Sequence, residues 1–435
     1  MNFEESIDWL YSFKQYGSKL GLERISFLMN QLKNSQNNFK IVHVAGTNGK
    51  GSVCKYVGSI LQKAGYAVGV YISPHLERFS ERIVIGDTEI SEKDITVLIK
   101  KIKPVVDEMI HNDNTPTFFE IVTAMAFQFF SDSSVDFAVV EVGLGGRFDA
   151  TNIVTPLVSV ITNISLEHTA QLGEDVKSIA FEKAGIIKEN IQVVTAVKDE
   201  SKGVVEKIAE KKNAPITYID SGSWKRLSHT IHYQEFLVHG ILNGHTVKTS
   251  MLGKYQGENI TLAITAAEQL QMKGTYLTDS YIIDGISTAF NPGRMEIISE
   301  EPRILLDGAH NPAGMNMLKK TLKEDFEYER LILVIGILED KDIHSMLSVI
   351  IPLSDVIIAT KSKNARACGS TALKDRIKNI GYTKELYAKD SLSDAINHAR
   401  SLAHKNDLIC ISGSLFTVGE ARSYFVKSLK QIIKS

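Results

Sequence analysis

The stretch Ile41-Val-His-Val-Ala-Gly-Thr-Asn-Gly-Lys-Gly-Ser52 decides the fold, because its two halves predict a strand and a phosphate-binding turn. The first half is a short apolar run rich in β-branched residues, and the second is a glycine-rich turn before a helical pattern. Gly46 and Gly49 allow a tight turn whose N–H groups point inward, and Lys50 supplies a charge for outer phosphates. The stretch predicts strand, phosphate loop and helix around a nucleoside triphosphate with Mg²⁺.

The motif departs from the strict Walker pattern, since Val44 replaces its first glycine and Gly51 follows Lys50. A glycine-rich turn between a strand and a helix can also be an ordinary tight connection, so the pattern alone leaves both interpretations open. Its wording resembles the phosphate loop of the Mur ligase superfamily, in particular the folylpolyglutamate synthase and dihydrofolate synthase branch. The resemblance implies ATP contacts from consecutive residues, namely Gly46, Thr47, Asn48, Gly49, Lys50, Gly51 and Ser52.

Length, charge and cysteine content bound the class of protein. A chain of 435 residues predicts two domains or three, and a formal charge of −2 argues against a nucleic-acid partner. The three cysteines have no metal-like spacing and are typical of reduced thiols in an intracellular protein. The start of the chain lacks a signal-peptide pattern, and no apolar run reaches the length of a membrane span. We expect a cytoplasmic protein with no membrane partner.

Strand and helix patterns alternate along the chain and predict an α/β fold with a mostly parallel sheet. We expect a P-loop N-terminal domain over residues 1–293 and a smaller doubly wound α/β domain over residues 294–435. The boundary is placed at Asn291-Pro-Gly-Arg-Met-Glu296, where Pro and Gly interrupt a helical pattern before new strands. Residues 223–251 alternate polar and apolar positions, which predicts antiparallel hairpins at the sheet edge.

The polar segment Ser73-Pro-His-Leu-Glu-Arg-Phe-Ser-Glu-Arg-Ile83 follows the second predicted strand of this sheet. By itself it is either a solvated connection or part of a site at the carboxyl end of the strands. It is similar to the family's mobile loop, which implies a magnesium-ligand role for Ser73. The resemblance also places substrate-side residues next to a pterin, from this loop and from Thr117-Phe-Phe-Glu120, although two adjacent rings are more often core. These residues are His75, Arg82, Phe118 and Phe119.

Glu141 ends an otherwise apolar strand predicted over residues 137–142. Burying a carboxylate without a partner costs several kcal/mol, so this residue needs a cation. A lysine or arginine in a buried ion pair would serve, but beside a phosphate loop Mg²⁺ suits a hard oxygen ligand better. The stretch Glu141-Val-Gly-Leu-Gly-Gly146 resembles a family segment whose glutamate contacts the metal.

His168 and Lys183 follow the next predicted strand, which covers residues 157–162. A histidine at a strand exit is usually a surface or cap residue, and a lysine on a helix is usually solvated. Their spacing is similar to that of the family's second metal site, which implies that Lys183 is carbamylated and that two Mg²⁺ sites exist. A lysine ammonium has no lone pair, so only the carbamate could ligate a metal. An ammonium paired with ATP phosphate remains the alternative.

The chain beyond residue 250 supplies further candidates. Leu252-Gly-Lys-Tyr-Gln-Gly-Glu-Asn259 is similar to a family segment that implies a nucleotide contact for Asn259. The resemblance assigns a phosphate contact to Arg294 at the domain boundary. Asp307-Gly-Ala-His-Asn-Pro312 follows a predicted strand, as an N-cap and turn would, but the resemblance implies that Asp307 and His310 face the nucleotide.

These features together predict an ATP-dependent ligase that joins L-glutamate to a reduced folate through an acyl phosphate. Dihydropteroate is a second acceptor that the resemblance allows. A Mur-type ligase for another carboxylate would share most motifs, and a nucleotide-dependent switch protein would share the phosphate loop alone. We expect catalytic roles for Lys50, Glu141, His168 and Lys183, and a monomer.

Overall fold

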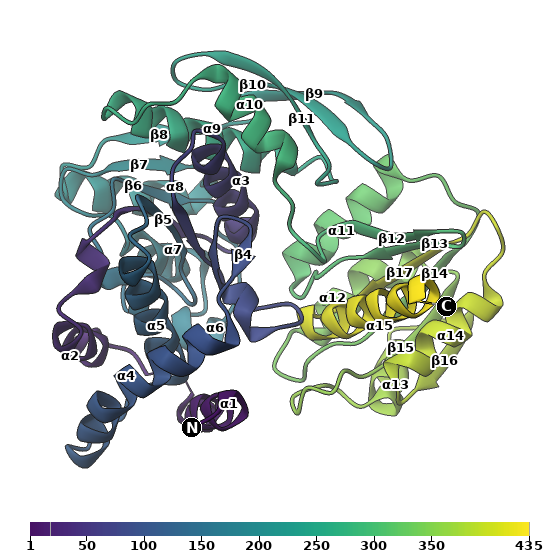
Figure 1. Ribbon diagram of the computed structural model, residues 1–435. Helices are drawn as coiled ribbons and strands as arrows, with labels where there is room; N and C mark the ends of the chain where they lie inside the picture. Colours follow the sequence, from purple (N-terminus) through teal and green to yellow (C-terminus); the bar gives the residue numbers. More distant parts are fainter. Residues whose placement is uncertain (18, 435) are drawn as a thin grey trace.

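The computed structural model describes residues 1–17 and 19–434, with side chains as far as residue 426. Figure 1 shows two α/β bodies side by side, with a set of antiparallel strands across the top. The larger body contains an eight-stranded sheet in the order β4-β3-β2-β5-β1-β6-β7-β8. All neighbours are parallel except the pairs made by β3, which confirms the predicted mostly parallel sheet.

The strands of this sheet are β1 (Lys40–Ala45), β2 (Val68–Tyr71), β3 (Ile83–Ile85), β4 (Thr88–Glu89), β5 (Phe137–Glu141), β6 (Val158–Ile161), β7 (Gln192–Thr195) and β8 (Ile216–Tyr218). Their side chains alternate between two cores, so Val42 and Val44 face one layer of helices while Ile41 faces the other. The first layer consists of α3 (Lys50–Lys63), α9 (Gln256–Met272) and α10 (Asp279–Thr288). The second consists of α1 (Phe3–Ser12), α2 (Glu23–Gln31), α4 (Glu92–His111) and α5 (Phe118–Asp132). Three more helices follow β6, namely α6 (Thr169–Leu172), α7 (Val176–Ala184) and α8 (Asp199–Lys211).

The predicted hairpins do form, but not at the edge of the large sheet. β9 (Trp224–His229), β10 (Gln234–His239) and β11 (Gly244–Thr249) make a separate antiparallel sheet. Phe236 and Val238 of its central strand are fully buried in the core that also contains α9. The sheet therefore buries its apolar face against a helix layer and, among the described residues, forms no strand pair with the larger sheet.

The smaller body has a six-stranded sheet in the order β12-β13-β17-β14-β15-β16. Its strands are β12 (Glu296–Glu300), β13 (Arg303–Leu306), β14 (Leu331–Ile335), β15 (Val356–Thr360), β16 (Glu385–Lys389) and β17 (Leu408–Ser412). The helices on one face are α11 (Pro312–Asp325), α12 (Ile343–Ile350) and α13 (Ser370–Asn379), and those on the other are α14 (Leu392–Leu402) and α15 (Leu415–Lys434). This arrangement confirms the predicted doubly wound domain.

Two strands of this sheet are not among the predicted strands, and both are at its edges. β12 pairs antiparallel with β13, and β16 pairs only with β15. Edge strands are only partly covered, so their sequences are mixed and lack the continuous apolar run of β14 or β17. Among the described residues, no helix combines the length and the apolar character that crossing a membrane requires.

Candidate active site

The phosphate loop lies at the carboxyl end of β1, in the middle of the large sheet. Gly49 has φ +90°, a conformation that favours glycine, and a Cβ there would overlap the side chain of Asn259. Lys50 Nζ folds back and donates to the carbonyl oxygens of Gly46 and Thr47, both at 3.1 Å. The lysine therefore occupies the concave side of the loop, where its charge would meet a phosphate.

Glu141 ends β5 directly beside the phosphate loop, because Val44 and Glu141 are register partners of adjacent parallel strands. Its side chain is buried, and Oε2 accepts a hydrogen bond from the backbone N–H of Ser73 at 2.9 Å. Burial raises the pKa of Glu141, against the opposing charge of Lys50. A buried carboxylate that accepts a hydrogen bond from a backbone N–H fits the ligand chemistry of Mg²⁺.

Lys183 projects from α7 to the first residue of the phosphate loop. Its Nζ donates to the carbonyl oxygen of Gly46 at 2.7 Å, and the side chain is almost completely buried. Burial, reinforced by the charge of Lys50, lowers the pKa of Lys183 to about 7. A lysine in this state has a substantial neutral fraction at neutral pH, as carbamate formation requires.

Glu167 is a site residue that the sequence analysis missed. Its side chain is 8% exposed, and Oε1 lies 3.5 Å from His310 Nε2 and 3.8 Å from His168 Nε2. Burial alone would raise the pKa of Glu167, but the hydrogen bond to His310 and the charge of Lys50 hold it well below its ordinary value. His168 therefore contacts a carboxylate, and burial lowers the pKa of His168 to about 4. The only sign of Glu167 in the sequence is its position between Leu166 and His168, in the segment that follows a strand.

The smaller body contributes the opposite wall. Arg294 Nη1 donates to the carbonyl oxygen of Gly308 at 3.1 Å. Asp307 accepts from the backbone N–H groups of Met295 and Ala309, and burial raises its pKa against the charge of Arg294. His310 lies two residues before α11, and its Nε2 is 3.5 Å from Oε1 of Glu167 in the larger body.

Asn311 joins the two bodies directly over the phosphate loop. Its Nδ2 lies 3.2 Å from Asn48 Oδ1 and 3.1 Å from Glu167 Oε1, while its Oδ1 caps α11 by accepting from the N–H of Gly314. The motif that contains Asn311 pointed to this edge of the sheet, but its sequence context predicted an N-cap and not an interdomain contact. Both roles use the same amide group.

One cavity of about 690 Å³ collects the predicted nucleotide and metal residues. Its lining includes every residue from Gly46 to Ser52, together with Ser73, Glu141, His168, Lys183, Asn259, Arg294, Asp307 and His310. Within the part of the chain that the structure describes, no cluster of three or more His, Cys, Asp or Glu side chains is arranged as a metal site. A metal here would therefore need serine, backbone, phosphate or modified-lysine oxygens beside Glu141.

The four substrate-side candidates lie outside the lining of this cavity, in an adjoining aromatic group. Arg82 Nε donates to His75 Nδ1 at 2.8 Å, and the Arg82 guanidinium lies 5.5 Å from the centre of the Phe118 ring. Phe119 stacks on Tyr71 with 6.0 Å between ring centres. Burial lowers the pKa of His75 to about 3, with the Arg82 charge acting in the same direction. Both rings also belong to the core cluster around α5.

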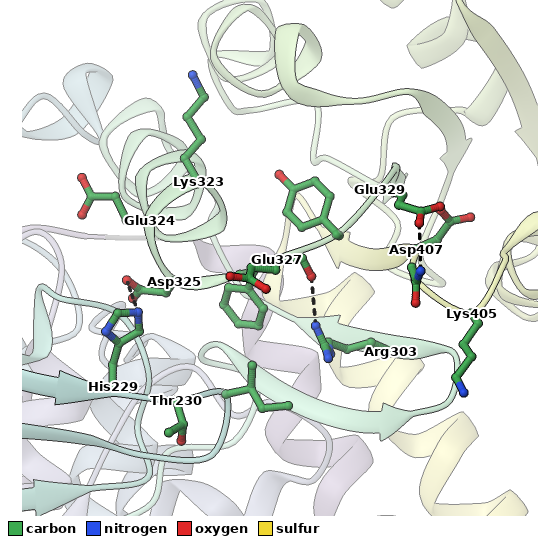
Figure 2. A pocket seen from close by; sticks show the side chains of 14 residues that line it. His229, Thr230, Arg303, Lys323, Glu324, Asp325, Glu327, Glu329, Lys405 and Asp407 are labelled. Carbon is green, nitrogen blue, oxygen red and sulfur yellow. Dashed lines mark hydrogen bonds and ion pairs between the residues drawn. The ribbon is translucent and has the colours of Figure 1, made fainter.

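A second cavity, of about 830 Å³, lies at the opposite end of the smaller sheet. Figure 2 shows Asp325 facing His229 of β9 on one side, and Lys323 and Lys405 pointing away from each other on opposite sides. Its cations do not converge on a common point, so we assign it no ligand. It marks a second contact between the two bodies.

Comparison with known proteins decides the family. The Mur ligase middle domain matches residues 44–267, and the Mur ligase glutamate ligase domain matches residues 293–415. The chain is 35% identical to the dihydrofolate synthase/folylpolyglutamate synthase of Bacillus subtilis, over 97% of this chain and 98% of that protein. The chain belongs to the folylpolyglutamate synthase and dihydrofolate synthase family of Mur ligases.

Solved structures of this family have the same fold. Mycobacterium tuberculosis folylpolyglutamate synthase complexed with ADP aligns with a TM-score of 0.91 at 31% identity, covering 98% of this chain and 99% of that one. Escherichia coli FolC in complex with DHPP and ADP aligns with a TM-score of 0.84 at 32% identity, covering 99% and 98%. Likeness over nearly the full length means that both bodies of this chain have counterparts in the family.

Proposed function

We propose that the protein is an ATP-dependent amide ligase that adds L-glutamate to a reduced folate. The observation that carries this proposal is the single cavity in which Lys50 and Glu141 of one body face Arg294 and Asp307 of the other. Family membership supports the same reaction class. A nucleotide switch protein would not require a second body that contributes charged residues to the nucleotide side.

The chemistry requires two displacements. A carboxylate oxygen of the acceptor attacks the γ-phosphorus of ATP, the bond to the β-phosphate oxygen breaks, and ADP leaves. The glutamate nitrogen then attacks the acyl carbon, the bond to the phosphate oxygen breaks, and phosphate leaves with the release of one proton. Both steps depend on alignment and charge neutralisation more than on a protein nucleophile.

We assign the roles as follows. The loop N–H groups and Lys50 bind the outer phosphates, and Arg294 with Asp307 positions the nucleotide when the two bodies are closed. Glu141, Ser73, His168 and carbamylated Lys183 would hold Mg²⁺ at two sites. Bound there, Mg²⁺ would neutralise charge that develops on the transferring phosphoryl group. His75, Arg82, Phe118 and Phe119 line the folate side.

Carbamylation of Lys183 is part of this proposal. The neutral amine attacks the carbon of CO₂, one C=O bond becomes C–O⁻, and the nitrogen loses a proton, which leaves an anionic carbamate. The low pKa of Lys183, about 7, favours the neutral amine that this step consumes. The modified side chain would have to leave the carbonyl oxygen of Gly46 or extend past it.

The direct test incubates the protein with Mg-ATP, labelled glutamate and one acceptor at a time. The acceptors are a reduced folate, dihydropteroate and a cell-wall precursor that carries a carboxylate. We expect glutamate incorporation with the reduced folate, and incorporation with dihydropteroate would add dihydrofolate synthase activity. Incorporation with the cell-wall precursor alone, or ATP hydrolysis that needs no amino acid, would contradict the proposal. Size measurement in solution tests the expected monomer.

A further inference from the structure

We propose that Arg422 is a positioning residue that fastens the β2–β3 loop (residues 72–82) and β12 to helix α15. Closure of the two bodies and placement of this loop then become one event. The inference rests on the proposed function, because it concerns how the ligase assembles its substrate side. Figure 1 shows the segment after β2 extending from the larger body to the beginning of α15.

One contact of Arg422 is with the β2–β3 loop. Its Nη1 lies 2.5 Å from Glu77 Oε1, and the hydroxyl of Ser423 donates to Glu77 Oε2 at 2.6 Å. Both oxygens of Glu77 are therefore held by adjacent residues of α15. The Glu77 side chain is only 7% exposed, so this ion pair is shielded from solvent.

The same guanidinium also contacts the domain boundary. Arg422 Nε lies 3.0 Å from both carboxylate oxygens of Glu296, the first residue of β12. Glu296 Oε2 in turn accepts from the backbone N–H of Gly293 at 2.7 Å, one residue before Arg294. One cation thus forms ion pairs with two buried carboxylates that come from the two bodies. Without it, both buried carboxylates would lose the cation that they share, and docking of the loop would be disfavoured.

Packing next to the ion pair also holds the loop against α15. Leu76 packs against the core cluster that contains Val418 of α15. A Cβ at Gly419 would overlap the carbonyl oxygen of Leu76, so the loop backbone lies directly on the helix at this point. Glycine is required here by close approach and not by helix geometry, since alanine is the better helix former.

Hydrogen bonds within the loop connect its parts to one another. Glu81 accepts backbone N–H hydrogen bonds from Leu76, Glu77 and Arg78, at 2.8, 3.2 and 2.9 Å for the shortest contacts. The beginning of the segment is tied to Glu141 through the N–H of Ser73, and its end carries Arg82 bonded to His75. A displacement at Glu77 therefore shifts both the metal-side and the folate-side residues.

The chain offers a matched control at the second contact between the bodies. Arg226 of β9 pairs with Asp325 of α11 at 2.7 Å, with side chains 10% and 6% exposed. Figure 2 shows the same Asp325 facing His229 of β9, at the cavity of about 830 Å³. Arg226→Ala removes a buried interdomain ion pair without touching the β2–β3 loop.

The first measurement is amide hydrogen exchange of residues 72–82 in the full-length protein without ligands. We expect Arg422→Ala, Glu77→Gln and Gly419→Ala to raise the exchange rate about 10-fold in this segment. Arg422→Lys should have a smaller effect, because lysine keeps the charge but lacks the planar set of N–H donors that bonds both carboxylates. Arg226→Ala should leave the segment unchanged. Equal exchange in wild type and Gly419→Ala, or the same increase in Arg226→Ala, would overturn the proposal.

The second measurement is steady-state ligation with a reduced folate. We expect Arg422→Ala and Gly419→Ala to raise the KM for the folate about 10-fold and to raise the ATP hydrolysed per glutamate added, while the KM for ATP stays within about twofold. A loss of kcat alone, shared with Arg226→Ala, would show a merely structural role and overturn the proposal. A wild-type protein that ligates no glutamate would refute the proposed function, and hydrogen exchange would still decide the docking role of Arg422.

Discussion

The ammonium nitrogen of Lys183 lies 2.7 Å from the carbonyl oxygen of Gly46, so a lysine of α7 touches the first residue of the phosphate loop. Such a group is expensive to bury as an ammonium, and its pKa of about 7 reflects that cost. The geometry leaves two chemical states open to the side chain, a cation beside phosphates or a carbamate beside a metal.

We expect the carbamate. Protein equilibrated with ¹³C-bicarbonate should give a carbamate carbon signal that grows as pH rises through about 7, because the neutral amine is the reacting form. Lys183→Ala should lose the signal and most of the activity, and acetate should restore part of the activity by replacing the missing carboxylate. A fully active alanine variant, or well-ordered density that shows a bare lysine with metal bound, would rule the carbamate out.

Lys50→Ala should lower the rate of ligation by about 1,000-fold, because the outer phosphates lose a preorganised charge. Its two hydrogen bonds to loop carbonyls are only partly buried, so their loss should cost about 1 kcal/mol each at most. Activity and thermal unfolding of the same preparation check both statements. A variant that keeps a large fraction of the wild-type rate would refute the phosphate-loop assignment.

Glu141→Gln should abolish magnesium-dependent turnover while leaving the ligand-free protein at least as stable as wild type. Burial raises the pKa of this carboxyl, which means that its charge is unfavourable until a cation binds. An amide keeps the shape and can still accept from the N–H of Ser73. Thermal melts with and without Mg-ATP are the measurement, and a large loss of stability in the ligand-free state would point to a buried ion pair instead.

His43 should make stability depend on pH. This residue of β1 is fully buried, and its Nε2 must donate to Thr151 because the Thr151 hydroxyl donates to Asp149. Burial lowers the pKa of His43 to about 3, so the folded state binds its proton far less readily than the unfolded chain. The stabilisation that His43 contributes to the free energy of unfolding is complete above an unfolded-state pKa of about 6.5 and is lost as pH falls toward 3. The loss amounts to about 2 kcal/mol between pH 7 and pH 5.

Urea unfolding at these two pH values tests this prediction, with His43→Gln as the control. Glutamine can present an N–H near the position of Nε2 but does not titrate. The variant should lose about 2 kcal/mol less than wild type on going from pH 7 to pH 5. Equal losses would show that other groups dominate the acid sensitivity.

Sequence reasoning succeeded where local pattern and chemistry coincide. β1, β5, β14 and β17 are mostly apolar, and each meets a polar cluster at its carboxyl end, which is where α/β sheets bind ligands. The edge strands β12 and β16 and the separate sheet of β9 to β11 depart from the predictions. The pairing of these strands depends on which neighbouring elements cover them, and a sequence of mixed polar and apolar residues does not predict those neighbours.

The sequence by itself determined the α/β class, the phosphate loop and the identity of the charged residues that need a partner, such as Glu141. These follow from periodicity, from glycine placement and from the cost of burying a charge, all of which act over a few residues. Only the tertiary structure decided that Glu167 lies between His168 and His310, that Asn311 bridges to Asn48, and that Arg422 joins Glu77 to Glu296. Apart from that between Glu167 and its neighbour His168, those contacts join segments far apart in the chain, so they depend on the packing of whole layers and leave no local pattern.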